Sequence, residues 1–287
     1  MKDLLDKVVA VTGAASGIGR ALALRLALEG CRLSLSDVDS KGLEETRDML
    51  GGGSEKVATA IVDVSDKEQV YDWANRTAAD FGRVDMVINN AGVTASDTLA
   101  DITYDDFEWV FNIDFWGVVY GTRAFLPHLL KRPEAHIVNV SSINGIMPFP
   151  YNGPYNCAKF AVKGFNETLM IELRDTSVHV SSVHPGGVKT NITRNMRFTK
   201  VSDDPVRKED MVTLFDKVAK TTSEQAAGRI VKGIRGNKKK ILVGMDAKII
   251  DLAVRIMPLS AIKMAGKQHS RLMTIANRSN RPNKKNT

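Results

Sequence analysis

The sequence has few of the residues that build disulfide frameworks or metal centres. It contains two cysteines, Cys31 and Cys157, and five histidines in 287 residues. The histidines form neither an HxH nor an HExxH pattern, and two distant cysteines lack the spacing of zinc ligands. We therefore expect no metal site. The low cysteine content is typical of a reducing compartment, so we expect a cytoplasmic protein.

Long apolar runs are missing as well. No stretch approaches the roughly 20 uninterrupted apolar residues that a membrane-spanning helix needs. The start, MKDLLDKVVAVTG, mixes acids and bases before its first apolar run and so lacks the organisation of a signal peptide. With 43% hydrophobic and 25% charged residues, the composition and length predict one large globular domain.

The net charge of +7 is concentrated near the end of the chain. Residues 228–287 contain 15 Lys and Arg against two Asp, a balance of +13 that leaves residues 1–227 at −6. This basic segment has no aromatic residue, whereas binders of single-stranded nucleic acid interleave bases with aromatics, so we expect no nucleic-acid partner. A solvated surface and peripheral contact with an anionic membrane both remain open for it.

Seven short apolar runs rich in Val and Ile alternate with longer amphipathic segments. The runs are KVVAVTG, CRLSLSD, KVATAIVDV, DMVINNAG, HIVNVSS, VHVSSVHPG and KKILVGMD. This alternation predicts an α/β fold, with a doubly wound parallel sheet of about seven strands and helices on both faces. Ligands of such sheets bind beyond the carboxyl ends of the strands, so the residues after each run are the expected site.

A glycine loop follows the first run, with Gly13, Gly17 and Gly19 before a helix-like segment. Glycines let the backbone approach a pyrophosphate, which the N–H groups at the helix start then stabilise. Asp37 ends the second run 18 residues after Gly19, where the acid that binds an adenosine ribose is expected. A role of Asp37 as a turn residue or N-cap is the alternative.

Asp37 also bears on the choice of cofactor. A carboxylate accepts hydrogen bonds from ribose hydroxyls but repels a 2′-phosphate, so we expect NAD(H). No Arg or Lys lies between Gly13 and Gly19 to offset that repulsion. Arg20 and Arg32 are near enough in the sequence to keep NADP(H) as the alternative.

Two further strand ends offer groups for the adenosine half of a dinucleotide. Asp63 and the N–H of the next residue, Val64, are placed to meet the adenine edge, although Asp63 could equally cap the following helix. The motif NNAG, residues 89–92, ends the fourth run. Its small residues allow close approach of a ribose, while its asparagines could instead satisfy backbone groups of the loop.

The motif YNCAK places Tyr155 and Lys159 one helical turn apart. A tyrosine with a pKa of about 10 is a poor base near neutral pH, but an ammonium on the same helix face stabilises tyrosinate. Ser142 lies thirteen residues earlier at a strand end and is placed to hydrogen-bond a substrate oxygen. Taken singly, the pair could be a helix-surface contact and Ser142 a turn residue.

Five separated motifs, TGAASGIG, NNAG, Ser142, YNCAK and PGGVKT, resemble those of the short-chain dehydrogenases/reductases in order and spacing. The resemblance runs from about Lys7 to Gly244. Three residues between Gly13 and Gly17 resemble the ordinary reductase branch. The resemblance implies a single Rossmann-like domain, a nicotinamide cofactor, reversible hydride transfer between an alcohol and a carbonyl, and a homodimer or homotetramer.

The resemblance also implies roles for individual residues. Tyr155 would be the general acid/base, with Ser142 and Lys159 assisting. Lys159 would hold the nicotinamide ribose, while Thr190 and the backbone of Val188 would hold the carboxamide. The full cofactor-binding set implied in this way is Gly13, Ser16, Gly17, Ile18, Gly19, Asp37, Asp63, Val64, Asn90, Ala91, Gly92, Tyr155, Lys159, Pro185, Gly186, Val188 and Thr190.

One position departs from the family pattern. The family has an asparagine three residues before a glycine in the helix preceding the catalytic strand, and here Asp114 stands three residues before Gly117. Asn112 is two positions away, which on a helix is the opposite face. By resemblance the asparagine holds a water that relays protons from the lysine. We expect Asp114 to attract Lys159, weaken its help to Tyr155 and alter the pH optimum.

The remaining segments suggest a substrate class and a division of the chain. We expect residues 1–246 to form the catalytic domain, with 191–222 as a substrate lid, and 247–287 to form a basic amphipathic extension. Apolar residues in and near the lid predict a lipophilic secondary alcohol or ketone, although they could equally be packing residues. They are Met147, Phe149, Tyr151, Met196, Phe198, Met211, Leu214 and Phe215. The alternative function is a cofactor-binding sensor or scaffold with little turnover.

Overall fold

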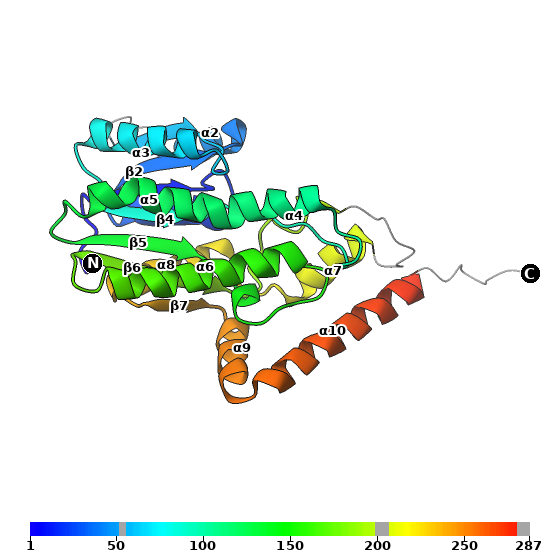
Figure 1. The fold of residues 1–287 in the computed structure, drawn as a ribbon. Helices are drawn as coiled ribbons and strands as arrows, with labels where there is room; N and C mark the ends of the chain where they lie inside the picture. The colour runs from blue at the N-terminus through cyan, green and yellow to red at the C-terminus, as the bar shows by residue number, and fades with distance from the viewer. Residues whose placement is uncertain (52–55, 199–206, 280–287) are drawn as a thin grey trace, which may run out of the picture.

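The computed structural model of the protein describes residues 1–51, 56–198 and 207–279. Its strands form one seven-stranded parallel sheet in the order β3-β2-β1-β4-β5-β6-β7, shown in Figure 1. The strands are β1 (Val8–Thr12), β2 (Arg32–Asp37), β3 (Val57–Ile61), β4 (Met86–Asn89), β5 (Ala135–Val140), β6 (Val178–Pro185) and β7 (Lys240–Val243). All seven apolar runs of the sequence are therefore strands, and the expected doubly wound α/β sheet is confirmed.

Helices connect the strands and continue beyond the last one. They are α1 (Gly17–Leu28), α2 (Ser40–Met49), α3 (Lys67–Phe81), α4 (Tyr104–Phe111), the π-helical turn η1 (Asn112–Trp116), α5 (Gly117–Leu129), the 3₁₀ turn η2 (Ile143–Gly145), α6 (Gly153–Glu172), α7 (Lys208–Val218), α8 (Ser223–Arg235), α9 (Met245–Ile256) and α10 (Pro258–Ser279). No described helix is long and apolar enough to cross a bilayer.

Two hydrophobic cores lie on opposite faces of the sheet. On one face, Leu22 and Leu26 of α1 pack with Ile230 of α8 against the sheet. On the other, Trp73 of α3 packs edge-on against Phe125 of α5, with ring centroids 5.0 Å apart. Strands buried on both faces explain why the runs in the sequence are continuously apolar rather than alternating.

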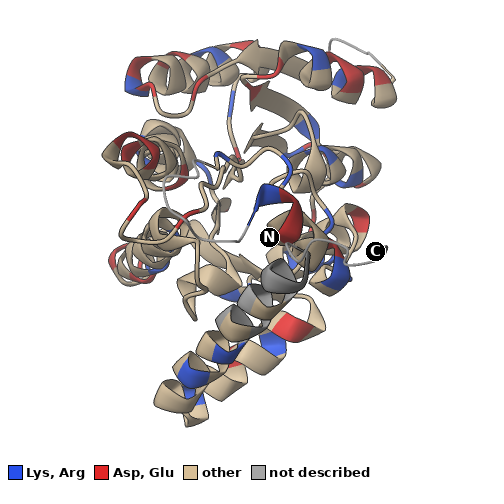
Figure 2. Ribbon diagram, turned by 90° about the vertical axis from the view of Figure 1, so that its right-hand side faces the viewer, with Lys and Arg blue, Asp and Glu red and all other residues tan. Residues whose placement is uncertain are grey.

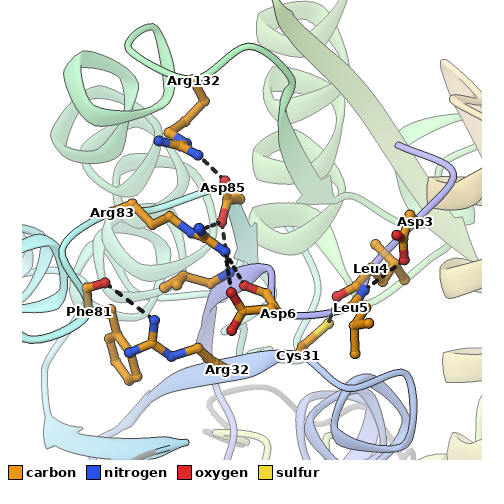
Figure 3. Close-up of polar contacts among 11 residues, drawn as sticks. Asp3, Leu4, Leu5, Asp6, Cys31, Arg32, Phe81, Arg83, Asp85 and Arg132 are labelled. Carbon is orange, nitrogen blue, oxygen red and sulfur yellow. Dashed lines mark hydrogen bonds and ion pairs between the residues drawn. The ribbon is translucent and has the colours of Figure 1, made fainter.

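The amino edge of the sheet is held by a buried carboxylate (Figure 3). Asp85, just before β4, is fully buried and accepts hydrogen bonds from the Val8 N–H at 2.9 Å and from Arg83 Nε at 3.1 Å. Its second oxygen accepts from Arg132 Nε at 2.9 Å. Arg83 also pairs with Asp6, at 2.8 Å. This network ties β1, β4 and the end of α5 together at the edge opposite the expected site.

The direction of chain progression reverses between β1 and β4. β1 pairs with β2 on one side and with β4 on the other, so Val11 lies opposite both Leu35 and Ile88. The helices that follow β1 and β4 therefore cover opposite faces of the sheet, α1 one face and α5 the other. A doubly wound sheet binds its ligand in the crevice at this point.

Candidate active site

The glycine loop between β1 and α1 has the backbone that its sequence predicts. Gly13 and Gly17 have positive φ angles of 68° and 53°, which side chains with a Cβ disfavour. Ser16 is the N-cap of α1, but its side chain makes no capping hydrogen bond and the first turn has no acid. A Cβ on Gly17 would lie 3.3 Å from Thr190 Cγ2. The positive end of α1 therefore faces the loop that carries Thr190.

Asp37 lies at the carboxyl end of β2, beside the glycine loop. Its carboxylate accepts hydrogen bonds from the Ala15 N–H at 2.9 Å and from the Asp39 N–H at 3.0 Å. The N-cap of α2 is Asp39, so the capping alternative for Asp37 is wrong and the turn contact is real. Asp37 both shapes the glycine loop and presents a negative charge next to it.

The two arginines that kept NADP(H) open both have partners within the chain. Arg20 donates to Thr46 Oγ1 at 2.9 Å and pairs with Glu45, also at 2.9 Å. Arg32 lies over the ring of Phe81, with 4.9 Å from its guanidinium carbon to the centroid. Arg20 also donates to the Ala15 carbonyl in the glycine loop and to the Gly42 carbonyl at 3.0 Å, so the choice between NAD(H) and NADP(H) stays a prediction.

The NNAG loop after β4 is held to β1 by a residue that sequence reasoning missed. Thr12 Oγ1 accepts hydrogen bonds from the Asn90 N–H at 2.9 Å and the Ala91 N–H at 3.0 Å. The side chain of Asn90 donates to the Thr12 carbonyl at 3.0 Å, so for Asn90 the backbone-satisfying role is confirmed. A Cβ on Gly13 would lie 2.8 Å from Ala91 Cα. The two loops are thus packed backbone against backbone.

Asp63 and Val64 follow β3 at the adenine side. One oxygen of Asp63 accepts from both the N–H and the hydroxyl of Ser65, at 2.9 and 2.7 Å. The N-cap of α3 is Asp66, whose side chain accepts from the Gln69 N–H. The capping alternative for Asp63 is therefore wrong, and its carboxylate instead organises its own turn.

Asp114 lies in a π-helical turn between α4 and α5. Asn112 is exposed whereas Asp114 is fully buried. The two side chains therefore lie on different faces, as expected for residues two positions apart on a helix. Asp114 Oδ1 accepts from the Val93 N–H at 2.7 Å, just after the NNAG motif. A Cβ on Gly117 would lie 2.9 Å from Val64 Cγ2, so only glycine lets the helix approach the sheet this closely. π turns of this kind recur at functional sites.

Lys159 extends from α6 to the same place and is almost wholly buried. Its ammonium lies 2.9 Å from Asp114 Oδ2 and donates to the Val140 carbonyl at 3.2 Å. The ammonium is 5.4 Å from the centroid of the Tyr155 ring. The two side chains of YNCAK therefore face the interior of the site and are not a helix-surface pair.

Ser142 completes the group from the opposite side of Tyr155. It is the N-cap of η2, where its hydroxyl accepts from the Asn144 N–H at 3.1 Å, and it lies close enough to the Tyr155 phenol to lower the pKa of that group. The structure thus brings Asp114, Ser142, Tyr155 and Lys159 together at the carboxyl edge. Their catalytic roles remain predictions.

Burial and the charges within the group both shift the pKa values of its members. Burial raises the pKa of Tyr155, the Lys159 ammonium lowers it, and the Asp114 carboxylate raises it again, with a net upward direction. Burial alone would lower the pKa of Lys159, but Asp114 and Tyr155 outweigh it and raise that pKa. Burial raises the pKa of Asp114 although the Lys159 charge opposes this. Asp114 therefore competes with Tyr155 for the help of one ammonium, as expected from the sequence.

A buried chain of hydrogen bonds leads to Ser142 through residues that the sequence did not reveal as a group. Asn89 donates to Asn139 at 2.7 Å, Asn139 to Asn166 at 2.7 Å, and Asn166 to Ser182 at 2.9 Å. Asn139 and Asn166 each accept from one neighbour and donate to the next, whereas Asn89 only donates and its Oδ1 has no hydrogen-bond partner within the described part of the chain.

The chain ends at His184. Its Nε2 lies 2.9 Å from Ser182 Oγ and its Nδ1 lies 3.0 Å from the Ser142 carbonyl. A carbonyl can only accept, so Nδ1 carries the proton and the imidazole is neutral. Burial lowers the pKa of His184 to about 4. A neutral histidine thereby holds the backbone of Ser142.

Asn156, next to Tyr155, ties the catalytic helix to the loop after β5. Its side chain accepts from Asn144 at 2.8 Å and donates to the Phe149 carbonyl at 2.8 Å. Asn144 in turn hydrogen-bonds Ser142. Asn144 and Asn156 therefore link the loop that carries Ser142 to the start of α6, which carries Tyr155. Ala158 is buried, but Cys157 is an exposed free thiol.

The loop after β6 carries the residues expected near a nicotinamide. Asp246 Oδ2 accepts from the Gly187 N–H at 2.6 Å, and a Cβ on Gly186 would lie 2.2 Å from the same carboxylate oxygen. Val188 forms a bridge with Thr221. Asp246, which sequence reasoning did not single out, therefore holds this loop from the first turn of α9.

The apolar residues expected to line a substrate site divide into two sets. Met147 and Phe149 pack against Ala261 and Ala265 of α10 and against α9, so for these two the packing alternative is confirmed. In the proposed lid, Met196 is buried, while α7 has no fully buried residue. Residues 199–206 of that segment lie outside the described residues.

The doubly wound α/β sheet and the polar group at its carboxyl edge are those expected of a nicotinamide-dependent oxidoreductase. The chain belongs to the short-chain dehydrogenase family, whose family model matches residues 7–200. This confirms the resemblance inferred from the five motifs.

Individual relatives agree with that membership. The chain is 40% identical over 260 residues to SadH of Mycobacterium tuberculosis, a protein assigned by name to the oxidoreductases, covering 90% of this chain and 93% of that one. It is 31% identical to estradiol 17-beta-dehydrogenase 11 of Pongo abelii, covering 90% of this chain and 81% of that one. A Burkholderia phymatum short-chain dehydrogenase/reductase, solved in complex with NAD, superposes with a TM-score of 0.81 at 32% identity, covering 91% and 97% of the two chains.

Proposed function

We propose that the protein catalyses reversible hydride transfer between a lipophilic secondary alcohol and the corresponding ketone, with NAD(H) as cofactor and Tyr155 as general acid/base. The observation that carries the proposal is the convergence of Ser142, Tyr155, Lys159 and Asp114 at the carboxyl edge of the sheet. A family member with this convergence would act on a substrate hydroxyl beside Ser142 and Tyr155 once a nicotinamide cofactor is bound.

The residues present fit a dinucleotide. The uncapped, acid-free start of α1 offers N–H groups to a pyrophosphate, and Asp37 lies next to it as the acceptor for ribose hydroxyls. When bound, the nicotinamide ring supplies the hydride acceptor or donor. NAD(H) is favoured over NADP(H) because Arg20 is held by Glu45 and Arg32 lies over Phe81, so the charge of Asp37 would repel a 2′-phosphate.

The protein's own side chains then transfer one proton to or from the substrate oxygen. In alcohol oxidation, Ser142 orients the substrate hydroxyl and the Tyr155 oxygen takes its proton. The Lys159 ammonium stabilises the tyrosinate before this step, and its bonds to the Val140 carbonyl and Asp114 keep it in place. In ketone reduction Tyr155 returns the proton. Asp114 Oδ2, 2.9 Å from Lys159 Nζ, is placed to exchange a proton with it.

A panel of secondary alcohols and ketones of increasing apolar size, assayed with NAD(H) and NADP(H), tests the proposal. We expect turnover that rises with apolar size and prefers NAD(H), and a loss of 10²–10⁴-fold in kcat for Tyr155→Phe. Tyr104→Phe, at a highly exposed position, is the control and should be unaffected. Quenching of tryptophan fluorescence by NADH without turnover on any compound would favour the cofactor-binding sensor or scaffold instead.

The proposed apolar character of the substrate rests on the apolar residues of the lid segment and of residues 147–151, of which Met196 and Tyr151 are buried. We further propose that residues 191–222 close over the substrate as a lid within a catalytic domain of residues 1–246, and that 247–287 are an extension. Limited proteolysis with and without NADH would test the lid. Protection of the segment around Lys208 by NADH is the expected outcome, and equal cleavage in both states would contradict it.

We also propose a homo-oligomer and a cytoplasmic location. Trp116 at the end of η1 and Phe160 of α6 are each 41% accessible, which suits a subunit interface. The exposed free thiol of Cys157 is typical of a reducing compartment. Light scattering of the purified protein would distinguish a dimer or tetramer from a monomer, and cell fractionation would test the location.

A further inference from the structure

The helices α9 and α10 form a pair that projects from the body. In Figure 1 they make a V below the sheet, with α9 leaving β7 and α10 running back towards α7. The break between them is at Met257 and Pro258. The inner side of the pair is packed, since Ala261 and Ala265 of α10 are buried with Met147.

The outer side of the pair is apolar and exposed. Seven large apolar side chains there are each more than half accessible to solvent. They are Ile249, Leu252, Ile256, Met257, Leu259, Ile262 and Met264. Amphipathic helices of a globular domain usually bury such residues, so this set, which we name the hairpin face, is suited to contact something outside the chain.

The charge of the hairpin face has one sign. Lys248, Arg255, Lys263 and Lys267 are exposed, and Figure 2 shows Lys and Arg positions in blue along the projecting helices. The acids of the pair are both occupied. Asp251 is buried and pairs with Lys240 and with Arg255 at 3.2 Å, and Asp246 accepts from the Gly187 N–H.

The exposed apolar side chains and the single sign of charge together favour a lipid surface over a second copy of the chain as the partner of the hairpin face. A second copy of the chain, placed symmetrically, would bring Lys248, Lys263 and Lys267 against their own counterparts, with no free carboxylate of the pair to offset them. An anionic lipid surface instead neutralises the cations and takes up the apolar side chains between them.

We propose that the hairpin face binds the surface of an anionic membrane, with its apolar side chains at the headgroup–acyl boundary and its Lys and Arg among the headgroups. The helices lie on the surface and do not cross it. The body is then held with the edge that carries Met147 and the Gly187 loop turned towards the lipid. Binding stands on the hairpin face alone and is independent of the proposed catalytic activity.

Co-sedimentation of the full chain with vesicles tests this directly. We expect the protein to pellet with vesicles of equimolar phosphatidylcholine and phosphatidylglycerol at low salt, to be released as salt screens the charges, and to stay in solution with phosphatidylcholine alone. Lys248→Gln/Lys263→Gln/Lys267→Gln should weaken binding on the order of 100-fold, at about 1 kcal/mol for each charge. Leu252→Ser/Ile256→Ser/Leu259→Ser should weaken it at least about tenfold.

Matched variants remove the same groups elsewhere on the surface. Lys41→Gln/Lys67→Gln/Lys131→Gln and Leu28→Ser/Met49→Ser/Ile61→Ser change exposed positions away from the hairpin face and should bind as the unaltered chain does. Protein that remains in solution with anionic vesicles at low salt would overturn the proposal, as would equal loss in the matched variants. Light scattering that finds the serine variant monomeric and the unaltered chain oligomeric would assign the face to a second copy instead.

Discussion

Asp114 Oδ2 lies 2.9 Å from Lys159 Nζ, and both side chains are buried to within a few per cent. The ammonium is shared among Asp114, the Val140 carbonyl and the face of Tyr155. A neutral side chain at position 114 would leave the full positive charge to the tyrosine. The pair therefore sets how strongly Tyr155 resists deprotonation.

Asp114→Asn should shift the pH dependence of alcohol oxidation. Burial raises the pKa of Tyr155 and the Asp114 charge raises it further, so removing the charge lowers that pKa. Oxidation needs the deprotonated tyrosine, and the rise of kcat/KM should therefore occur at lower pH in the variant. Asp105→Asn, an exposed change in α4, is the control. A profile that does not move would remove Asp114 from the proton chemistry.

Gly92→Ala should damage catalysis without unfolding the protein. A Cβ at this position would lie 3.2 Å from Asp114 Oδ2 and 3.4 Å from Lys159 Nζ, so the ion pair must move by a few tenths of an ångström. We expect kcat to fall by roughly tenfold, because small misplacements of catalytic groups are costly. Gly164→Ala in α6 meets nothing within 4 Å and should leave kcat unchanged while stabilising the helix by about 0.5–1 kcal/mol. Equal kcat in both variants would contradict the role of the pair.

Asp37→Asn should relax the choice of cofactor. The amide keeps an acceptor for only one of the Ala15 and Asp39 N–H groups, which bind different oxygens of Asp37, and it loses the charge. The affinity for NADH should therefore drop roughly tenfold and that for NADPH should rise. Fluorescence titration with both cofactors measures the ratio. Asp39→Asn, at the N-cap of α2, changes a neighbouring charge and should leave the ratio near its original value. An unchanged ratio in Asp37→Asn would place the selectivity elsewhere.

His184 should make stability depend on pH below neutrality. Its pKa is lowered from 6.5 to about 4 by burial, so the unfolded chain takes up a proton on this residue before the folded protein does. Stability is fully present above pH 6.5 and is lost as pH falls towards 4, by up to about 3 kcal/mol. Urea unfolding across this range should show a smaller loss in His184→Gln than in the unaltered chain. His128→Gln, at a partly exposed position, should keep most of the pH dependence, and a loss identical in all three proteins would contradict the assignment.

Asp85→Asn should destabilise the fold while leaving the site intact. The carboxylate is buried between Arg83, Arg132 and the Val8 N–H (Figure 3), and breaking such a network costs about 3 kcal/mol. Asp6→Asn removes a mostly exposed partner of Arg83 and should cost at most about 1 kcal/mol. Urea unfolding gives both values. A similar small cost for both changes would mean that the network contributes little.

The architecture could be predicted from the sequence because parallel strands buried on both faces leave continuous apolar runs. The same is true of Gly13, Gly17, Tyr155 and Lys159, whose chemistry depends on spacing within one loop or one helix. Strand ends that converge in space bring Ser142 and Asp37 to the same edge, which the topology of a doubly wound sheet already requires.

Other parts of the site depend on contacts between segments distant in the sequence. No sequence pattern around Thr12 or Asp246 distinguishes them from other polar residues. The side chain of each nevertheless accepts a hydrogen bond from a backbone N–H of a site loop. The chain from Asn89 to His184 crosses three strands and one helix, so no spacing rule reveals it. Asp63 and Asp66 are equally good caps by sequence, and only the start of α3 decides between them.

Because Asp114 lies in a π turn, its position depends on the number of residues in the segment Asn112–Trp116. An α-helix advances about 100° for each residue, and a π turn accommodates one residue more than an α turn. Deleting one residue between Asn112 and Trp116 would restore an ordinary helix and rotate either α4 or Asp114 out of place. Gly117 would then no longer meet Val64 where its missing Cβ is needed. In this segment a change in residue number, with no change in chemistry, would be enough to separate the carboxylate from its lysine.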